Sequence, residues 1–518
     1  MSPQLAAAME RLPEYLGWHV LLSASALILG AAISLPLAIA AGRGRRLRWP
    51  VLAGASLVQT IPSLALLALF YPLLLALSAL SEATLGRGFS ALGFLPALLA
   101  LTLYSMLPML RNGVAGLTGL DPAVREAADG VGMCPGQRLW RVELPLAAPV
   151  IMAGVRTAAV WTIGAATLST PVGQTSLGNY IFAGLQTENW VFVLFGCAAS
   201  AVLALAADQL LGLMEAGARL RSPLRIGAGA LGLAAGVALA VAPLAGGGRA
   251  ETYVVGAKNF SEQYILAELM AGRIERAGAG VQRKDGLGSA VAYRALAAGE
   301  LDVYVDYSGT LWTNALGRTD NPGRAEVLSQ LTAELKRRDG VTVLGSLGFE
   351  NAYAFVIRRE RAKALGIATL EDLAREAPKL TLGSDLEFLS RPEWKAVEAA
   401  YGLRFKARRS YQPTFMYRAL AGGEADVISA FSSDGRIAAD GLVILGDPKG
   451  AIPPYDAVVL VSPRRSDDAR LLAALRPLVG AVPVERMQAA NYSVDRDIGK
   501  LAPAEAAKAL EATISRAP

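Results

Sequence analysis

The sequence predicts a multidomain chain, in which an all-α polytopic membrane domain of about six helices is followed by a two-lobed α/β domain. Three observations support this prediction. The 518 residues are 53% hydrophobic and 18% charged, whereas ordinary soluble domains carry about 25% charged residues. Residues 1–250 contain 15 Arg, 10 acidic residues and no Lys, while the remainder contains 35 basic and 34 acidic residues. The hydrophobic pattern also changes near residue 250, from long apolar runs to short strands that alternate with helices.

Six apolar segments in the first half are each close to the roughly 20 residues that span a bilayer. They cover residues 18–41, 51–77, 94–110, 149–172, 190–207 and 226–244. The third segment is the shortest, and the fourth contains Arg156. We therefore expect a transmembrane domain over 1–225, a sixth membrane helix with a Gly-rich tether over 226–250, and an α/β domain over 251–518.

The arginines of the first half cluster in alternate loops. The loops after the first, third and fifth segments hold Arg43, Arg45, Arg46, Arg48, Arg111, Arg125, Arg138, Arg141, Arg219, Arg221 and Arg225, whereas the other loops hold only Arg87. Because basic loops face the cytoplasm, the N-terminus and residues 251–518 are expected on the outer side. Residues 1–17 lack the charged start and the cleavage site of a signal peptide, so we expect the first segment to remain as a membrane helix.

The second half alternates short β-type runs with helical patterns. The expected strands are 253–256, 303–305, 341–344, 354–357, 380–383, 427–430, 443–445 and 458–461. An amphipathic helix is expected over 261–277, with Ser261 as its N-cap. This alternation predicts α/β architecture with largely parallel sheets. Because about 268 residues exceed a typical single core, we expect two lobes with a cleft between them, the second lobe covering approximately 350–450.

Composition also excludes several classes of function. The chain has one His, His19, and two Cys, Cys134 and Cys197, all in the apolar half. The sequence therefore offers no His-based catalytic site, no metal cluster and no disulfide framework in the second half. It contains no G-x-x-x-x-G-K-[ST] phosphate loop, so no bound ATP or other cofactor is expected. The net charge of +6 follows from the arginine-rich loops rather than from a nucleic-acid surface. We expect neither catalytic residues nor a metal site.

One arginine-rich loop carries a motif. Glu126-Ala127-Ala128 is followed by Gly132, four residues after the second Ala, and then, after nine intervening residues, by Val142-Glu143-Leu144-Pro145. This pattern resembles the coupling loop of ABC importer permeases, with Val142 in place of Ile. Gly132 permits a turn, and the Leu-Pro pair is expected to end the loop element before the next membrane helix. The resemblance covers roughly residues 17–215.

The resemblance implies the ABC importer permease fold in a bacterial inner (plasma) membrane. It implies a separate cytoplasmic ABC ATPase subunit that binds ATP and grips the loop, and two copies of this chain in the complex. The coupling residues carried over are Glu126, Ala127, Ala128, Gly132, Leu144 and Pro145. The further partners expected are the lipid bilayer and a small ligand, and not nucleic acid.

The second half is similar to the substrate-binding proteins for glycine betaine, choline and related compounds, which have a two-lobed periplasmic-binding-protein-like fold. The matching stretches are 256–263, 307–310, 350–353, 388–391, 430–436 and 453–455. Fusion of such a domain to its permease is a known arrangement in this group.

A quaternary ammonium group has no N–H to donate, so it is recognised by shape and by aromatic faces, each cation–π contact giving about 0.5–2 kcal/mol. Four rings occupy strand ends, where ligands bind in open α/β sheets: Tyr307, Tyr353, Phe431 and Tyr455. The carboxylate of a zwitterion also needs a cation or a donor, for which the candidates are Arg391, Lys258 and Thr310. The resemblance carries the cage role to the three Tyr and the carboxylate role to the other three. Phe431 departs from the resemblance, because Tyr is common at the corresponding cage position of these binding proteins.

The function expected is that of the membrane-spanning and substrate-binding subunit of an ATP-driven importer for glycine betaine, choline or a similar quaternary ammonium osmolyte, and not of an enzyme. One alternative is another trimethylammonium cargo such as ergothioneine or carnitine, which Phe431 would also suit. An alternative of another class is a membrane solute sensor without transport, which would need a cytoplasmic output domain. Whether residues 251–518 face a periplasm or the cell exterior does not follow from the sequence.

Overall fold

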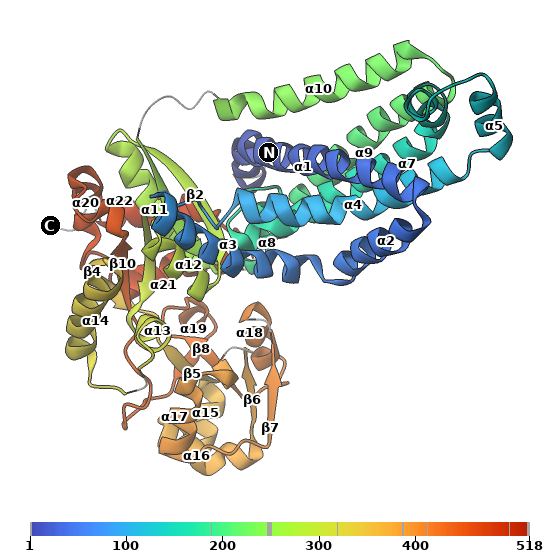
Figure 1. The fold of residues 1–518 in the computed structure, drawn as a ribbon. Coiled ribbons are helices and arrows are strands. Elements are labelled where there is room, and N and C mark those ends of the chain that lie inside the picture. Colours follow the sequence, from blue (N-terminus) through green and yellow to red (C-terminus); the bar gives the residue numbers. More distant parts are fainter. Residues whose placement is uncertain are drawn as a thin grey trace. The chain divides into compact units, whose positions relative to one another are not determined.

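The computed structural model describes residues 3–86, 88–187, 189–245, 251–318, 320–385, 388–411, 413–496 and 498–514. It divides into two compact units (Figure 1). The helical unit comprises Leu5–Phe182 and Val191–Arg249, and the α/β unit comprises Ala250–Pro518 together with Met1–Gln4 and Ala183–Trp190.

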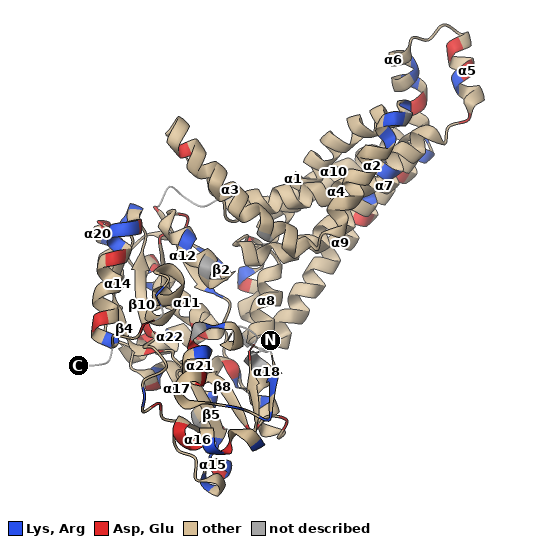
Figure 2. Ribbon diagram, turned by 60° about the horizontal axis from the view of Figure 1, so that its bottom comes forward, with Lys and Arg blue, Asp and Glu red and all other residues tan. Residues whose placement is uncertain are grey.

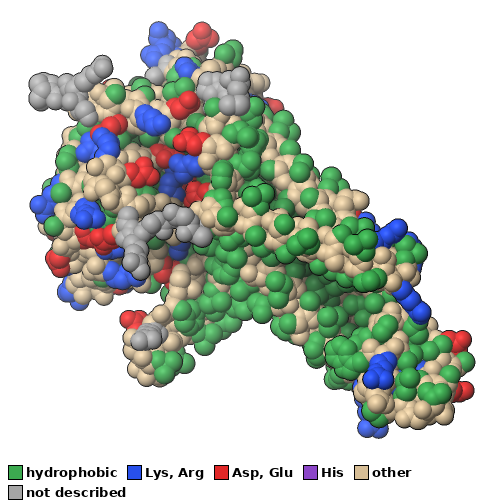
Figure 3. Space-filling view, turned by 90° about the horizontal axis from the view of Figure 1, so that it is seen from above, with side chains coloured by type: hydrophobic (Ala, Val, Ile, Leu, Met, Phe, Trp, Pro, Cys, Tyr) green, Lys and Arg blue, Asp and Glu red, His purple; other side chains and the backbone are tan. Residues whose placement is uncertain are grey.

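The regular elements described in the first half are all helical. They are α1 (Pro3–Arg43), α2 (Arg45–Thr60), α3 (Ser63–Leu85), α4 (Phe94–Thr118), α5 (Pro122–Gly130), α6 (Pro135–Arg138), the π-helical turn η1 (Leu139–Glu143), α7 (Leu144–Ala166), the 3-10 turn η2 (Thr167–Val172), α8 (Gly178–Gln186), α9 (Trp190–Arg219) and α10 (Pro223–Ala245). Among the described residues, six helical stretches are long and apolar enough to cross a membrane. Hydrophobic side chains cover the face of the long helices seen in Figure 3. The prediction of about six membrane helices is confirmed.

Several of the expected segments have different bounds: α1 begins at Pro3, before residue 18, and α9 runs on to Arg219, beyond residue 207. The stretch 51–77 is not one helix, because α2 ends at Thr60 and α3 begins at Ser63. Ile61 between them is extended, with φ −74° and ψ 126°, since a residue before proline disfavours the α conformation. The third segment runs on to Thr118 instead of ending at 110. Its extension packs closely against α7, where a Cβ on Gly116 would lie 3.2 Å from Val150.

The Leu144-Pro145 pair does not end the loop element, contrary to the sequence prediction. The chain is helical without interruption from Pro135 to Val172. The π-helical turn Leu139–Glu143 stands immediately before the pair, and Pro145 falls in the first turn of α7. The N–H of Leu144 donates to the carbonyl of Leu139 in the π-helical turn, and the wider backbone of that turn leaves room for the proline ring.

Arg156, in the middle of α7, is held by two carboxylates of α9. Its guanidinium donates to both carboxylate oxygens of Asp208, at 2.7 Å for the Nη2–Oδ2 contact, and Nη1 lies 3.4 Å from Glu215. Gly212 leaves room for the guanidinium, since a Cβ there would lie 3.3 Å from it. Charges inside a membrane segment are costly unless they are paired, so this cluster ties α7 to α9.

Replacing Arg156 with Leu should leave two unpaired carboxylates on α9 and lower the melting temperature of the full chain in detergent by roughly 3–6 °C. The double variant Arg156→Leu/Asp208→Asn removes one of these orphaned charges and should recover part of the loss. Equal losses in the single and double variants would show that the cluster does not stabilise the helices through its charges.

The α/β unit contains two five-stranded sheets, which we call lobe 1 and lobe 2. Lobe 1 has the strand order β2-β1-β3-β10-β4 and lobe 2 the order β7-β6-β8-β5-β9. Lobe 1 consists of β1 (Thr252–Lys258), β2 (Gly280–Leu287), β3 (Val303–Tyr307), β4 (Thr342–Glu350) and β10 (Asp456–Val461); lobe 2 consists of β5 (Tyr353–Arg358), β6 (Thr381–Ser384), β7 (Ala407–Ser410), β8 (Val427–Phe431) and β9 (Leu442–Ile444). The chain therefore passes from lobe 1 to lobe 2 between β4 and β5, and returns before β10.

Helices and short turns connect and cover these strands. They are α11 (Ser261–Arg276), α12 (Ser289–Ala297), α13 (Ser308–Thr310), η3 (Leu311–Ala315), α14 (Arg324–Asp339), α15 (Arg359–Leu365), α16 (Leu370–Glu376), η4 (Ala377–Lys379), η5 (Phe388–Ser390), α17 (Pro392–Tyr401), α18 (Pro413–Ala421), α19 (Arg436–Ala439), η6 (Pro463–Arg465), α20 (Ala469–Leu475), η7 (Arg476–Leu478), α21 (Val484–Asp495) and α22 (Pro503–Ile514).

The sheets are mixed, not largely parallel as the sequence predicted. Parallel pairs join β1 to β2 and β3, and β6 to β7 and β8. The two strands that follow a passage of the chain from one lobe to the other, β5 and β10, are antiparallel to their neighbours: β10 pairs with β3 and β4, and β5 pairs with β8 and β9. A strand that enters a sheet from the other lobe is not bound by the β-helix-β connection that makes neighbours parallel. Strands β2 and β7 were missed because both are polar edge strands without an apolar run.

Candidate ligand-binding site

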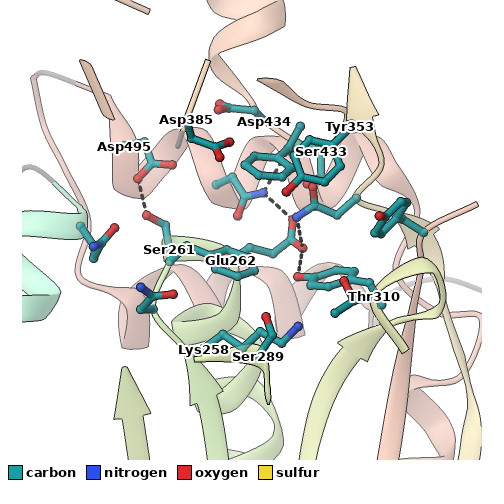
Figure 4. A pocket seen from close by; sticks show the side chains of 18 of the residues that line it. Lys258, Ser261, Glu262, Ser289, Thr310, Tyr353, Asp385, Ser433, Asp434 and Asp495 are labelled. Carbon is teal, nitrogen blue, oxygen red and sulfur yellow. Dashed lines mark hydrogen bonds between the residues drawn. The ribbon is translucent and has the colours of Figure 1, made fainter. Parts of the chain in front are cut away.

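All seven predicted ligand-binding residues line one cleft between the lobes, of about 350 Å³. They are Lys258, Tyr307, Thr310, Tyr353, Arg391, Phe431 and Tyr455. Five of them stand at or next to a strand end, while Thr310 ends α13 and Arg391 precedes α17. Figure 4 shows Lys258 and Thr310 across the cleft from Tyr353, Asp385 and Asp434. The volume lies in the range of small-molecule pockets.

Strand pairing brings the aromatic rings of lobe 2 together. Tyr353 begins β5 and faces Phe431, the last residue of β8, in the antiparallel register. Their ring centroids are 5.0 Å apart. The ring of Tyr353 also lies 4.6 Å from that of Phe388 and 5.8 Å, edge to face, from that of Tyr455. Tyr353 is 7% exposed, so it is the centre of a largely dry aromatic cluster.

Tyr307 is fixed by its hydroxyl group. The hydroxyl donates to Oε1 of Glu262 at 2.5 Å and accepts from Nε2 of Gln263 at 3.0 Å. The ring of Phe260 stacks on the ring of Tyr307, with 6.1 Å between the ring centroids. Burial, together with the Glu262 carboxylate, raises the pKa of Tyr307 well above its ordinary value. The hydroxyl is therefore used inside the protein, which leaves the ring as the part of Tyr307 available to the cleft.

Tyr455 is positioned by the turn that follows Tyr307. The hydroxyl of Ser308 donates to the carbonyl of Pro454 and accepts from the backbone N–H of Asp456, both at 2.9 Å. Gly309 lies against the ring of Tyr455, because a Cβ there would be 2.7 Å from ring carbons. The motif 307–310 thus sets the position of two aromatic side chains at once.

The two cations assigned to a ligand carboxylate already have carboxylate partners. Lys258 forms a buried ion pair with Asp306. Arg391 donates from Nε and Nη2 to Glu393, at 3.1 and 2.9 Å, and its Nη2 lies 3.4 Å from the hydroxyl of Tyr455. Despite burial, the Arg391 guanidinium holds the pKa of Glu393 below its ordinary value. A zwitterionic ligand would share these cations with Asp306 and Glu393.

Glu262 was not among the predicted site residues, although it is the hub of the cleft. It is 3% exposed and accepts from the hydroxyl of Tyr307 and from the side-chain amides of Asn351, at 3.1 Å, and Asn491, at 2.9 Å. Burial raises the pKa of Glu262 in spite of these hydrogen bonds. Glu262 and Asn351 stand inside the stretches 256–263 and 350–353 that resemble the substrate-binding proteins, so the sequence could have identified them as site residues. Asn491, on α21, stands in no such stretch.

A segment of lobe 2, residues 432–436, is hydrogen bonded to α21, which belongs with lobe 1. Nε2 of Gln488 donates to the carbonyl of Ser432, Nδ2 of Asn491 to that of Ser433, and Nη2 of Arg436 to that of Asp495, at 2.9, 2.9 and 2.6 Å. We call this set of contacts the latch. It holds the lobes together on one side of the cleft.

Ser261 is not the N-cap of its helix, contrary to the sequence prediction. Phe260 occupies that position, and the Ser261 hydroxyl donates to Oδ1 of Asp495 at 2.6 Å (Figure 4). The competing acceptor lies 234 residues away in the chain, which local pattern cannot reveal.

Asp495 should make stability depend on pH near neutrality. Burial, and then the nearby Asp434 carboxyl, raise the pKa of Asp495 to about 7, while an unfolded Asp titrates near about 3.9. Because the folded state holds the proton more tightly, this group's contribution to stability is greatest below about pH 4 and is lost as the pH rises to about 7. The melting temperature of the full chain should therefore fall more steeply between pH 5 and 7 than that of Asp495→Asn. Equal slopes would contradict the assignment.

Four of the six predicted coupling residues lie in one projecting segment of the helical unit, while Leu144 and Pro145 begin α7. Glu126, Ala127 and Ala128 are on α5, which Asp121 caps by accepting from the N–H of Ala123. Ala128 is buried, whereas Glu126 and Ala127 are exposed. Gly132 has a φ of +81°, so it makes the turn between α5 and α6. In Figure 2, α5 and α6 lie at the end of the helices where Arg residues gather.

Together, the membrane helices and the two-lobed cleft define a transport protein that carries its own binding domain. A family model described as the substrate binding domain of ABC-type glycine betaine transport systems matches residues 251–511, and a second, the binding-protein-dependent transport system inner membrane component, matches residues 33–220. The chain belongs to these ABC-type glycine betaine transport systems, with the inner membrane component and the substrate-binding domain fused. As a member with six apolar helices, it is a multi-pass inner membrane protein.

Similar proteins have either the fused or the separate arrangement. The chain is 28% identical over 466 residues to the ergothioneine transport permease/ergothioneine binding protein EgtU of Helicobacter pylori (strain G27), covering 85% of this chain and 79% of that protein. It is 38% identical over 197 residues to the choline transport system permease protein OpuBB of Bacillus subtilis (strain 168), covering 38% and 83%. It is 31% identical over 265 residues to the carnitine transport binding protein OpuCC of Listeria monocytogenes serotype 1/2a (strain 10403S), covering 50% and 85%.

Proposed function

We propose that the chain is the membrane and substrate-binding subunit of an ATP-driven importer for quaternary ammonium compounds. The observation that carries this proposal is the aromatic cluster of the cleft, in which Tyr307, Tyr353, Phe431 and Tyr455 line one pocket. Such rings attract a cation that has no N–H to donate, and they do so most strongly where water is excluded. The family, whose model is named for glycine betaine transport, supports the same class of cargo.

The cargo itself is glycine betaine, choline or a similar osmolyte in this proposal. Ergothioneine or carnitine is the second candidate, and two relatives favour it by name. The ion pairs of Lys258 and Arg391 bear on this choice, because a ligand carboxylate must share those cations with Asp306 and Glu393.

The energy for transport comes, in this proposal, from a separate cytoplasmic ABC ATPase that grips α5 and α6. Two copies of the chain form the pathway, and residues 251–518 lie on the outer side of the membrane. Two observations support the cytoplasmic assignment of the loop: Glu126 and Ala127 are exposed to solvent, and arginines cluster at that end of the helices.

Calorimetric titration of the full chain in detergent tests the binding step. Glycine betaine, choline, carnitine and ergothioneine are titrated, with dimethylglycine as a control that has one methyl group fewer and an N–H. We expect one quaternary compound to bind, dimethylglycine to bind at least about tenfold more weakly, and Tyr307→Ala to bind more weakly than Phe415→Ala, a replacement of an exposed ring. Absence of binding by all four compounds would overturn the cargo class. If dimethylglycine bound as tightly as the quaternary compound, the assignment of the four rings as a cage for a quaternary ammonium group would be overturned.

A further inference from the structure

Glu143 is a buried carboxylate at the base of the coupling segment. It is 5% exposed and ends the π-helical turn before α7. Three guanidinium groups surround it: those of Arg43, Arg125 and Arg138 lie 3.6, 3.4 and 3.3 Å from its oxygens. A single carboxylate thus serves three cations, and the motif-based assignment of coupling residues did not include it.

The three arginines come from different elements. Arg43 is the last residue of α1, Arg125 lies on α5 and Arg138 ends α6. Each makes a further contact. Nη2 of Arg43 donates to the carbonyl of Pro135 at 3.1 Å, Nη2 of Arg125 donates to the carbonyl of Leu117 on α4, and Nη1 of Arg138 donates to Asp129 on α5 at 2.6 Å. Glu143 is therefore the point at which α1, α5, α6 and α7 meet.

The geometry of this junction is loose. All three ion-pair distances exceed the 2.7–2.9 Å of a charge-assisted hydrogen bond. Nε of Arg125 and Nε of Arg138 are buried and have no hydrogen-bond acceptor among the described residues. Buried donors without acceptors are costly, so these ion pairs stabilise the observed position of the loop only weakly. The loop can therefore adopt a different position. The charges do not balance either, since among the described residues Asp129 alone, which binds Arg138 at 2.6 Å, adds a second carboxylate to the cluster.

We propose that Glu143 is a positioning residue for energy coupling, which joins α1 and α5 to the continuous helix formed by α6, η1 and α7, so that movement imposed on the loop reaches the membrane helices. This inference rests on the proposed function, because it assumes an ATPase that moves the loop. Without the Glu143 charge, three neighbouring guanidinium groups repel one another and lose their shared anchor. Movement of α5 then no longer carries α1 and the continuous helix of α6 and α7 with it.

The test compares Glu143→Gln with Asp129→Asn in the full chain, reconstituted in proteoliposomes with its ATPase. Asp129 pairs with Arg138 in the same loop and is about half exposed, so it is the matched control for loss of one negative charge. The compound that binds most tightly in the titration above serves as the radiolabelled probe. Uptake, ATP hydrolysis and ligand binding are measured on the same preparations.

We expect Glu143→Gln to bind ligand and hydrolyse ATP like the parent, while the number of ligands transported per ATP falls by about three- to tenfold. Asp129→Asn should remain within about twofold of the parent, and Glu143→Asp should recover part of the loss. A parent chain without ATP-driven uptake would overturn the proposed function. A parent with uptake, and a Glu143→Gln variant with the same transport per ATP, would overturn the role of Glu143.

A second measurement covers the case in which Glu143→Gln does not assemble with the ATPase. Trypsin cleavage between residues 122 and 141 is followed in the full chain alone, for the parent and for Arg43→Gln, which removes one of the three cations and leaves the carboxylate paired. We expect faster cleavage in Arg43→Gln, because α6 loses its link to α1. Unchanged cleavage would overturn the junction.

Discussion

Replacing Tyr353 with alanine should weaken binding of the quaternary ammonium ligand by about 30-fold or more, since one desolvated cation–π contact is worth about 2 kcal/mol. The ring lies within 6 Å of three other aromatic rings, so its removal also loosens Phe431 and Tyr455. Water would then enter the cluster and weaken every remaining cation–π contact. Calorimetric titration of the full chain measures the loss.

Tyr353→Phe is the matched control, because it keeps the ring and removes only the hydroxyl group. It should stay within about fivefold of the parent if the ring face is what binds the cation. A large loss in Tyr353→Phe, or a small one in Tyr353→Ala, would show that the ligand is held by polar groups of the cleft instead.

Replacing Gly435 with alanine should weaken ligand binding by about 10- to 100-fold without altering any ring of the cage, if the variant loses two or three hydrogen bonds worth about 1 kcal/mol each. A Cβ at this position would lie 2.3 Å from the carbonyl of Gln488 and 2.6 Å from Cβ of Tyr492. The segment 432–436 must then move away from α21, which breaks the latch. The closed arrangement of the lobes becomes less stable, and the ligand must offset that cost.

Gly272→Ala provides the comparison for the loss of a glycine. Gly272 lies on α11, where a Cβ would meet nothing within 4 Å, and alanine favours a helix. We expect this variant to bind ligand like the parent. Small-angle X-ray scattering of the full chain with saturating ligand should show a more open α/β unit for Gly435→Ala. Unchanged affinity in Gly435→Ala would mean that the latch does not contribute to closure.

The two variants separate two contributions to affinity. Tyr353 acts on the contact with the cation, whereas Gly435 acts on the equilibrium between lobes. If the variant acts through the equilibrium between the lobes alone, ligands with and without a carboxylate should lose affinity in the same proportion in Gly435→Ala, although Ser433, Asp434 and Arg436 line the cleft. A proportion that depends on the ligand would place the segment 432–436 in direct contact with it.

The sequence predicted the features that depend on short stretches of chain. Membrane helices follow from about 20 apolar residues in succession, and the turn after α5 follows from Gly132 in the motif 126–145. The seven predicted ligand-binding residues were accessible for the same reason, since each stands in a short matching stretch at a strand end or a helix start. All seven line the cleft.

Errors arose where a residue's neighbour is distant in the chain. Ser261 has the pattern of an N-cap, but Asp495 accepts from its hydroxyl. The strands β5 and β10 read as members of parallel sheets, but the crossings between lobes make their pairs antiparallel. Local propensity is a fraction of a kcal/mol per residue, and a single buried contact from another part of the chain outweighs it.

The sequence by itself thus determined the architecture, the family and the chemistry of the aromatic rings. Only the tertiary structure decided how the charges are used: that Lys258 and Arg391 are paired with Asp306 and Glu393, that Glu262 binds Tyr307, and that three arginines share Glu143. The physical reason is that hydrophobic burial follows composition and periodicity along the chain. A buried charge instead requires a specific partner at a few ångströms, and folding alone brings such partners together.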